Sequence, residues 1–168
     1  LATHDLEGAY LGTALGQDIY TQESVKNGHY NHLATINRVR QCGSIPKFIE
    51  EEHINNGIIY NCVKPQVPFV LAGYIRDDGP LPEVYGNVYE AQDAMRNHVR
   101  KATTVICLAT MLHTIATGNM TPSFRVLPDG TIREVYFYCV DISEFTVNKL
   151  TDRGSLSARG IVTNAQDF

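Results

Sequence analysis

The chain has 168 residues, of which 43% are hydrophobic, which is enough for one globular domain with its own core. The formal net charge is -4 and Lys and Arg form no stripe, which argues against a nucleic-acid partner. The longest apolar stretch, residues 103–110, is too short to cross a bilayer and no export signal is visible, so we expect a soluble, cytoplasmic protein.

The cysteines and histidines are the candidates for redox or metal chemistry. The cysteines are widely spaced without a C-x-x-C pair, so reduced thiols are expected. His29 and His32 could face one way on a helix, but no third ligand stands at metal-binding spacing. We therefore expect no metal site, and polar contacts for both imidazoles where a loop meets a helix. The cysteines are Cys42, Cys62, Cys107 and Cys139.

The first third of the chain predicts helices. Apolar residues recur at helical spacing over residues 3–15, and a second amphipathic pattern follows a polar loop and ends at Gly43. Ser44 can cap a third helix that runs to a stop at residues 56–57. The chain opens at Leu1 on a helical pattern, without an initiator Met or a preceding strand, so we expect it to be part of a longer protein.

Apolar runs in the remainder of the chain predict a parallel sheet. Residues 67–73, 103–110 and 135–141 are rich in β-branched and aromatic side chains without strict alternation, as in strands that are buried on both faces. A strong amphipathic helix, residues 84–101, lies between the first two. Strands that alternate with helices are typical of right-handed parallel crossovers. The fold class is therefore α/β, a doubly wound and mostly parallel Rossmann-like sheet.

Three further elements complete the predicted domain. Residues 123–134 contain a Pro-Asp-Gly turn between short apolar runs and indicate an inserted hairpin. Ser143 can cap a helix that Gly154 ends, and residues 160–163 could be a final strand. No linker composition or repeat interrupts the chain, so residues 1–168 are expected to form a single domain.

Ligands of open parallel sheets bind beyond the carboxyl ends of the strands, so the residues after each strand are the candidate site. Asp77 and Asp78 follow the first strand in a stiff Gly-Pro turn, where their position favours binding by one of them over a purely structural role. Asp141 ends the third strand, where an acid can accept both hydroxyls of an adenosine ribose. Asn164 and Ala165 hold the equivalent place after the last strand.

The second strand is followed at once by small and hydroxylated residues and a short helix. This segment, Thr110, Met111, Leu112 and His113, would bring backbone amides close to a pyrophosphate or a nicotinamide. His113 could instead be a helix histidine with ordinary contacts. The G-x-G-x-x-G fingerprint is absent from the sequence, so any phosphate site must be built differently.

Five strings of the sequence together cover most of the chain and carry a family resemblance: VPFVLAGYIRDDGPLPEV, EAQDAMR, CLATMLHTIATGNMTPS, CVDISEFTVNKLTDRGS and GIVTNAQDF. On these strings the chain resembles the LOR/SDH family, named for lysine-oxoglutarate reductase and saccharopine dehydrogenase. The characterised members of that family are archaeal ornithine cyclodeaminases and the C-terminal part of cyanobacterial arginine dihydrolases. The family's fold looks like that of deoxyhypusine synthase, which binds NAD without the usual glycine fingerprint.

The resemblance implies contacts with NAD after each strand. They fall to Asp78, Thr110, Met111, Leu112, His113, Asp141, Asn164 and Ala165. The chain departs from the family at Ser143 and Glu144, where Asn-Pro is usual, and at Asn164, where Asp is common. The family also has a strand and an Asn-Ala pair that touch the cofactor just upstream of the position of Leu1. We therefore expect the N-terminal part of the nucleotide fold to lie outside this sequence.

The activity that the resemblance implies is an NAD-dependent ornithine cyclodeaminase, an ammonia-lyase of arginine and ornithine metabolism that forms proline and regenerates NAD. Its substrate would be a small amino acid, and a homo-oligomer is expected. The catalytic base stays unassigned, although Asp77 or Asp78 could hold the substrate ammonium. The alternatives are a saccharopine-type amino-acid dehydrogenase and a non-catalytic nucleotide-binding or assembly module. Aminobutyl transfer of the deoxyhypusine-synthase kind lacks a lysine in a credible site.

Overall fold

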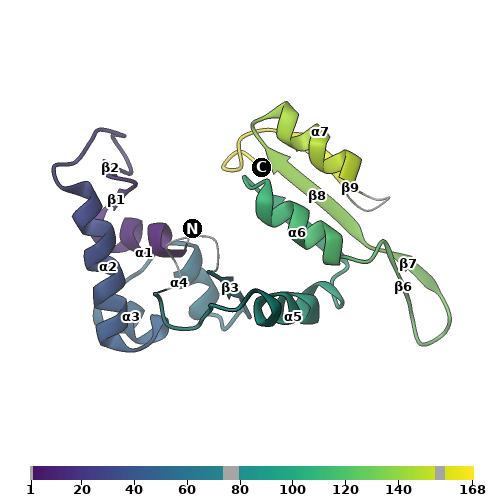
Figure 1. Ribbon diagram of the computed structural model, residues 1–168, viewed down its shortest axis with the longest axis horizontal. Coiled ribbons are helices and arrows are strands. Elements are labelled where there is room, and N and C mark those ends of the chain that lie inside the picture. Colours follow the sequence, from purple (N-terminus) through teal and green to yellow (C-terminus); the bar gives the residue numbers. More distant parts are fainter. Residues whose placement is uncertain (1, 74–79, 154–157) are drawn as a thin grey trace. The chain divides into compact units, whose positions relative to one another are not determined.

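The computed structural model describes residues 2–73, 80–153 and 158–168 (Figure 1). The chain forms two compact units, residues 1–91 and residues 92–168, and each is described by itself. The organisation as one domain stays a prediction. Among the described residues, no helix is long and apolar enough to cross a membrane.

The first unit is mainly helical, with two very small sheets. β1 pairs antiparallel with β2, and β3 pairs parallel with β4. The buried side chains of α1 to α4 form its hydrophobic core, together with Ile54 and Leu81. The elements are α1 (Ala2–Leu11), β1 (Thr13–Ala14), β2 (Gln17–Asp18), α2 (Gly28–Cys42), α3 (Ile45–Glu51), α4 (Ile58–Val63), β3 (Leu71–Ala72) and β4 (Val84–Tyr85).

The helix signals at Gly43 and Ser44 are confirmed. Gly43 follows α2 with a left-handed φ of 81° and closes the helix through its backbone N–H. The Ser44 hydroxyl accepts the backbone N–H of Lys47 at 3.3 Å and so caps α3. Local side-chain chemistry therefore fixes the junction between these two helices, as the sequence predicts.

Other boundaries in the first unit differ from the prediction. α1 ends at Leu11 and not at residue 15, because Gly12 takes a left-handed φ of 71° and the chain continues into β1. α3 ends at Glu51, and a further helix, α4, begins after Gly57. α4 was not predicted, because its six residues are too few for helical periodicity to be evident.

The first predicted strand is the main correction to the topology. Of residues 67–73, only Leu71–Ala72 form a strand, and they pair with β4, Val84–Tyr85, in the first unit. The predicted helix 84–101 is accordingly shorter, since α5 covers Val88–Val99. Hydrophobicity alone could not separate a short, partly buried stretch from a full sheet strand.

The second unit contains a three-stranded parallel sheet in the order β5-β8-β9. The predicted second, third and final strands are confirmed as its members, and the inserted hairpin is confirmed as β6 and β7. The elements after α5 are β5 (Thr104–Leu108), α6 (Leu112–Met120), β6 (Phe124–Val126), β7 (Ile132–Glu134), β8 (Tyr136–Asp141), α7 (Glu144–Arg153) and β9 (Ala158–Val162).

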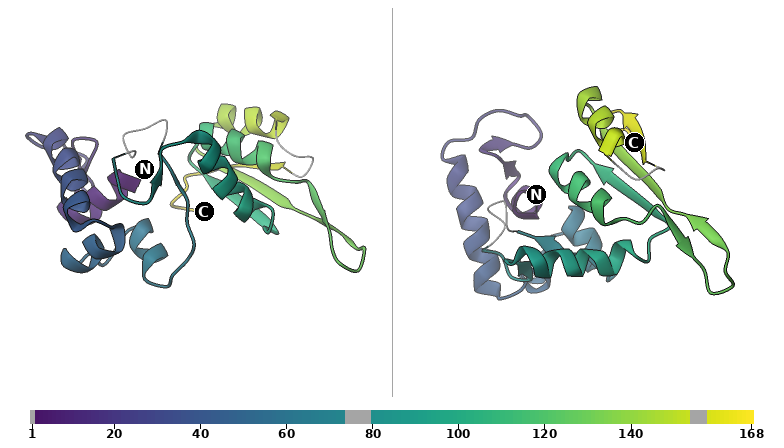
Figure 2. Two further views of the ribbon diagram at one scale, coloured as in Figure 1. Left: turned by 60° about the horizontal axis from the view of Figure 1, so that its bottom comes forward. Right: turned by 45° about the vertical axis from the view of Figure 1, so that its right-hand side comes forward.

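Helices α6 and α7 cover the same face of this sheet, as can be followed in Figure 2. Ile115 of α6 and Val147 of α7 pack around the buried Cys139 of β8. On the other face, Ile106 and Leu108 are 51% and 48% exposed. The described residues cover only one face of β5. The prediction that this strand is buried on both faces is therefore wrong.

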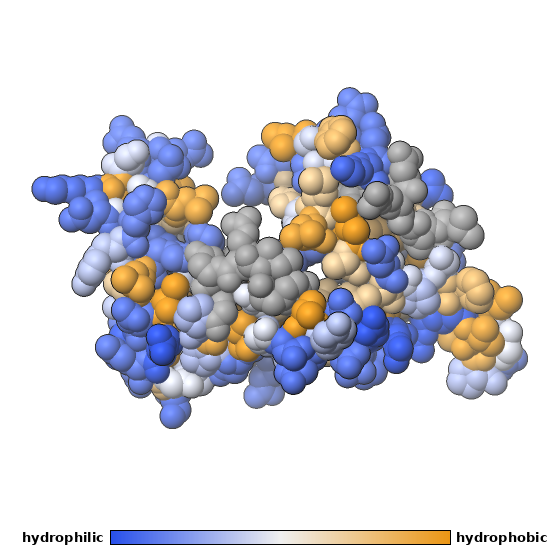
Figure 3. Space-filling view, in the orientation of Figure 1, coloured by the Kyte–Doolittle hydropathy of each residue, from blue (hydrophilic) through white to orange (hydrophobic). Residues whose placement is uncertain are grey.

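The two faces of the β6–β7 hairpin differ: its arginine side chains contact the rest of the unit, and its apolar side chains are exposed. Arg125 and Arg133 donate to the backbone carbonyls of Lys101 and Ala102, at 3.1 and 3.3 Å. The opposite side is apolar and exposed, and the orange side chains on the hairpin are visible in Figure 3. Its exposed apolar residues are Phe124, Val126 and Ile132. Arginine side chains therefore fasten the hairpin to the chain segment that precedes β5.

Candidate functional site

The carboxyl ends of β5, β8 and β9 lie at one edge of the second unit's sheet. The parallel register continues beyond the strands, since Ala109 donates its N–H to the Val140 carbonyl at 2.9 Å. Thr163 likewise donates its N–H to the Asp141 carbonyl at 3.1 Å. The segments that begin at Thr110, Asp141 and Asn164 therefore leave the sheet along the same edge, which is where ligands of open α/β sheets bind.

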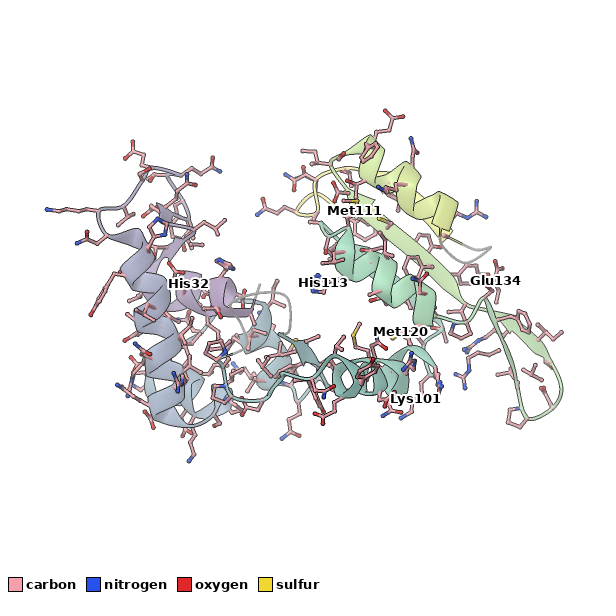
Figure 4. The ribbon with its side chains drawn as sticks, in the orientation of Figure 1. His32, Lys101, Met111, His113, Met120 and Glu134 are labelled. Atoms are coloured by element: carbon pink, nitrogen blue, oxygen red, sulfur yellow. The ribbon has the colours of Figure 1, made fainter. Side chains whose placement is uncertain are left out.

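The exit from β5 is a tight turn into α6. Ala109 has a left-handed φ of 52°, which is uncommon for a residue with a Cβ atom. The Thr110 hydroxyl lies 3.2 Å from Nδ1 of His113, and the Thr110 carbonyl accepts the Thr114 hydroxyl. The predicted segment is thus held by its own side chains at the start of α6, where Met111 and His113 are labelled in Figure 4.

The N-terminus of α6 presents backbone donors. Met111 occupies the N-cap position and makes no side-chain cap hydrogen bond. The N–H groups of the first helical turn have no partner within a helix, and the helix dipole adds positive potential at that end. A phosphate is the ligand that such a helix start favours.

The exit from β8 places a carboxylate beside a helix start. Oδ1 of Asp141 accepts the backbone N–H of Ser143 at 2.8 Å, while its second oxygen has no hydrogen-bond partner in the described part of the chain. The Ser143 hydroxyl lies 3.4 Å from the backbone N–H of Thr146, so Ser143 and not Asp141 caps α7. The predicted capping by Ser143 is confirmed, and the ribose-binding role of Asp141 stays a prediction.

The exit from β9 repeats this turn. Oδ1 of Asn164 accepts the backbone N–H of Gln166 at 3.1 Å, and its carbonyl accepts the N–H of Asp167 at 3.0 Å. Asn164 is exposed, whereas Ala165 is half-buried. Asp141 and Asn164 thus form the same local turn at two strand ends, although an amide carries no charge for a ribose or an ammonium group.

The chain matches a known protein family over its whole length. The model for the C-terminal Rossmann-fold domain of ArgZ-like arginine dihydrolases matches residues 1–168. The chain belongs to this family. The predicted resemblance and the predicted Rossmann-like fold class are both confirmed.

The ArgZ-like chain is also similar to named enzymes and solved structures. It is 50% identical, over 168 residues, to an ornithine cyclodeaminase of Methanothermobacter thermautotrophicus. The crystal structure of an LOR/SDH protein from Methanococcus maripaludis S2 matches it with a TM-score of 0.85 and 44% identity, over 98% of this chain and 46% of that chain.

A third relative is AgrE, a bifunctional arginine dihydrolase/ornithine cyclodeaminase of Nostoc sp.. The structure of the ternary complex of AgrE with ornithine and NAD+ matches with a TM-score of 0.82 and 43% identity, over 98% of this chain and 23% of that chain. The ArgZ-like chain spans 38% of the Methanothermobacter relative and 22% of AgrE as curated. The remaining 62% of the Methanothermobacter relative and 78% of AgrE lie outside the matched region.

One predicted cofactor ligand of the chain lies in a segment that the structure does not describe. Asp78 and its neighbour Asp77 lie outside the described residues. The strand that was expected to present them belongs to the first unit, as β3, and not to the sheet of β5, β8 and β9. A role for Asp78 stays a prediction.

The two cysteines of this sheet are unreactive. Cys107 and Cys139 are register partners on β5 and β8, and both are buried. Burial raises the pKa of Cys139 to about 11, and the neighbouring Cys107 thiol and the Asp141 carboxylate act in the same direction. Burial also raises the pKa of Cys107. Both residues therefore stay neutral thiols near neutral pH and are unsuited to nucleophilic chemistry.

A second polar cluster lies in the first unit, and only part of it was predicted from the sequence. His32 was expected to make polar contacts, and it lies 2.8 Å from the carboxylate of Glu7, which is fully buried. Glu7 was missed, although a signal was available. Thr3, Leu6 and Tyr10 place Glu7 on the inner face of the first helix, where a carboxylate is unusual.

Proposed function

We propose that this chain provides the cofactor-binding part of an NAD-dependent ornithine cyclodeaminase, which converts ornithine to proline and ammonia. The observation that carries the proposal is the strand-end edge formed by Thr110, Asp141 and Asn164. It is supported by the ornithine cyclodeaminase and by AgrE with ornithine and NAD+, which are similar to this chain along nearly its whole length.

The donor and acceptor groups at this edge fit a dinucleotide. The second oxygen of Asp141 is suited to a ribose hydroxyl, and a hydrogen bond to a charged group contributes about 1.5 to 3 kcal/mol. The first-turn amides of α6, from Leu112 to Thr114, are suited to a pyrophosphate. Asn164 and Ala165 would border the same ligand at the third strand end. Asp78, which the family resemblance implies as a cofactor contact, is kept as part of this proposal.

NAD, when bound, supplies the acceptor and donor of hydride in this chemistry. The residues of the chain position the reacting carbon and exclude water, which favours reaction over release of an intermediate. Thr110 and His113 hold each other at the start of α6 and so fix that turn in one conformation. Ser143 does the same for Asp141, because its N–H holds one carboxylate oxygen in place.

Turnover of labelled ornithine tests the proposal. The full-length protein is incubated with NAD+ and ornithine that carries heavy nitrogen at the α position, and proline, ammonia and NADH are quantified. We expect proline and ammonia in equal amounts, the label in ammonia, and no net accumulation of NADH. Because ring closure joins the δ-nitrogen to the α-carbon, the α-nitrogen is the one that leaves.

The same experiment separates the alternatives. A saccharopine-type dehydrogenase would accumulate NADH in proportion to the amino acid consumed, without proline. A non-catalytic nucleotide-binding module would bind NAD+ in a titration and leave ornithine unchanged. Either result would overturn the cyclodeaminase proposal.

The cytoplasmic location and the homo-oligomeric state are part of this proposal. All four cysteines are free thiols, which suits a reducing compartment. Light scattering of the full-length protein tests the oligomeric state, and a monomer would contradict it.

A further inference from the structure

Two arginine side chains lie next to each other on one face of the β6–β7 hairpin. Arg125 and Arg133 are register partners in the antiparallel pair, so their side chains project from the same face. Arg125 donates through Nη1 to the Lys101 carbonyl at 3.1 Å, and Arg133 donates through Nη2 to the Ala102 carbonyl at 3.3 Å. Two consecutive carbonyls therefore hold the two guanidinium groups side by side.

A like-charge pair in this position is unfavourable without a further partner. Like charges directly opposite each other destabilise an antiparallel pair, and each guanidinium carries five N–H donors. Attachment to the carbonyls uses one donor of each arginine. Nε of Arg133 is buried and has no hydrogen-bond partner among the described residues. A neutral side chain such as glutamine could reach a carbonyl without these costs, so attachment alone does not account for two positive charges.

No carboxylate neutralises this pair in the part of the chain that the structure describes. Neither Arg125 nor Arg133 forms an ion pair there. The hairpin has two acids. Glu134 is the register partner of Phe124 and so belongs to the apolar face, and Asp129 lies at the tip, where its carboxylate accepts a backbone N–H. The two guanidinium groups are thus half-buried cations without a described counter-ion.

The segment that holds the pair adds positive charge. Arg100 and Lys101 stand next to the carbonyls in the sequence, and both are exposed and without an ion pair in the described residues; Lys101 is labelled in Figure 4. The C-terminal end of α5 contributes about half a negative charge, which four cations outweigh. Arg96, one turn earlier, is already paired with Asp93 at 3.0 Å. In a chain of net charge -4, this local positive field would attract an anion.

The arginine pair lies away from the proposed cofactor edge. The hairpin leads directly into β8, and Tyr136 at the start of β8 donates its N–H to the Thr103 carbonyl, just before β5, at 3.0 Å. The pair is therefore near the amino ends of these strands, whereas Thr110 and Asp141 lie at their carboxyl ends. Residues 124–134 are also outside the five strings that carry the family resemblance. A ligand at the pair would be separate from the cofactor.

We propose that Arg125 and Arg133 bind a small oxyanion with at least two negative charges, carried by phosphoryl groups or by paired carboxyl groups. The planar fork of a guanidinium matches two oxygens of either group. Because both side chains are half-buried, their contacts with an anion are less screened than contacts at a fully exposed site. The carbonyls already hold the side chains in place, so binding costs little further conformational freedom.

The proposal goes beyond the proposed function and does not rest on it. Its residues all belong to the second unit, residues 92–168.

Calorimetric titration of the full-length protein with inorganic pyrophosphate, and separately with citrate, tests the site. We expect at least one of these anions to bind to the wild type, with an affinity that falls as the salt concentration rises. Arg125→Gln and Arg133→Gln should each weaken binding by about 10-fold or more. Arg96→Gln removes the same unit charge from the end of α5, but Arg96 is paired with Asp93, so its affinity should stay close to that of the wild type.

Conservative variants separate the guanidinium fork from its charge. Arg125→Lys and Arg133→Lys retain the positive charge and a donor for the carbonyl, so the hairpin should stay attached and the unfolding temperature should change little. They lack the planar fork, and binding of the anion should still weaken. These variants decide the result if a glutamine variant does not fold.

The outcomes distinguish the sources of the anion and can contradict the site. Arginine-dependent binding of pyrophosphate assigns the site to phosphoryl groups, and arginine-dependent binding of citrate assigns it to carboxyl groups. Absence of binding of both anions by the wild type would overturn the proposal. Wild-type affinity in Arg125→Gln and Arg133→Gln would also overturn it, because the anion would then bind elsewhere. Proline formation is not a readout of this experiment, so failure of the proposed function would leave its result unchanged.

Discussion

The Asp141 carboxylate accepts the backbone N–H of Ser143 at 2.8 Å, and this contact sets the orientation of the only charged side chain that the described strand ends place at the sheet edge. Asp129 makes the same turn with the N–H of Thr131, at 2.9 Å, in the exposed β6–β7 hairpin. The local geometry is therefore shared. What distinguishes Asp141 is its position, at the carboxyl end of a parallel strand and beside two others.

The capping of α4 by Asp5 gives a stability prediction. Its carboxylate oxygens accept the N–H groups of Ile58 and Ile59, each at 2.8 Å, and so satisfy two donors of the first helical turn. Asp5→Ala should lower the free energy of unfolding by about 0.5 to 2 kcal/mol in chemical denaturation. Asp93→Ala, which removes an exposed ion pair with Arg96, should change it by less than about 0.5 kcal/mol. Equal effects would refute the capping role.

Close backbone packing at Gly28 gives a second prediction. A Cβ atom at Gly28 would lie 2.4 Å from the Cα of Gly16, so backbone would have to move. Gly28→Ala should cost about 1 to 3 kcal/mol of stability through overpacking. Gly86→Ala is the matched control, because its Cβ would meet nothing within 4 Å. A Gly28→Ala protein as stable as the control would contradict this packing.

The left-handed turn at Ala109 gives a third prediction. Left-handed backbone costs an L-residue about 1 to 2 kcal/mol, and a β-branched side chain is a true outlier there. Glycine removes this backbone cost but has greater freedom in the unfolded chain, so Ala109→Gly should be about as stable as the wild type or more stable. Ala109→Val should be clearly less stable than both. Thermal unfolding of the three proteins checks this order. A valine variant as stable as the glycine variant would contradict the left-handed turn.

Part of the fold was predictable because it is encoded locally. Gly43 and Ser44 specify a helix end and a helix start by their own chemistry, and the hairpin follows from its turn residues. The strand 67–73 was misassigned because an apolar run does not reveal its partner. Pairing with β4 is a long-range contact that single-sequence patterns do not contain.

The candidate site divides in the same way. Asp141 and the segment from Thr110 were predictable, because a strand end is visible in the sequence and its ligand side follows from parallel topology. Glu7 was not predicted, since its significance depends on the approach of His32 from 25 residues further along the chain. Only the inner-face position of Glu7 was visible in advance.

The buried thiol of Cys139 predicts a dependence of stability on pH. Its pKa is raised to about 11 in the folded protein, mainly by burial, whereas an unperturbed thiol titrates near 8.5. Its contribution to stability is therefore complete below about pH 8.5 and is lost as the pH rises towards about 11. The alkaline loss in unfolding free energy should be smaller in Cys139→Val than in the wild type. Cys62→Val, at a thiol outside this sheet, controls for general effects, and the same loss in both variants would argue against this linkage.

The affinity for NAD+ tests the central claim most directly. Calorimetric titration of the full-length protein compares the wild type with Asp141→Ala and with Asp129→Ala, which removes the same turn in the hairpin. Loss of charged hydrogen bonds to ribose should weaken binding to Asp141→Ala by about 10-fold or more, at about 1.5 to 3 kcal/mol for each bond, and leave Asp129→Ala unchanged. Wild-type affinity in Asp141→Ala would contradict the assignment of this sheet edge as the cofactor site.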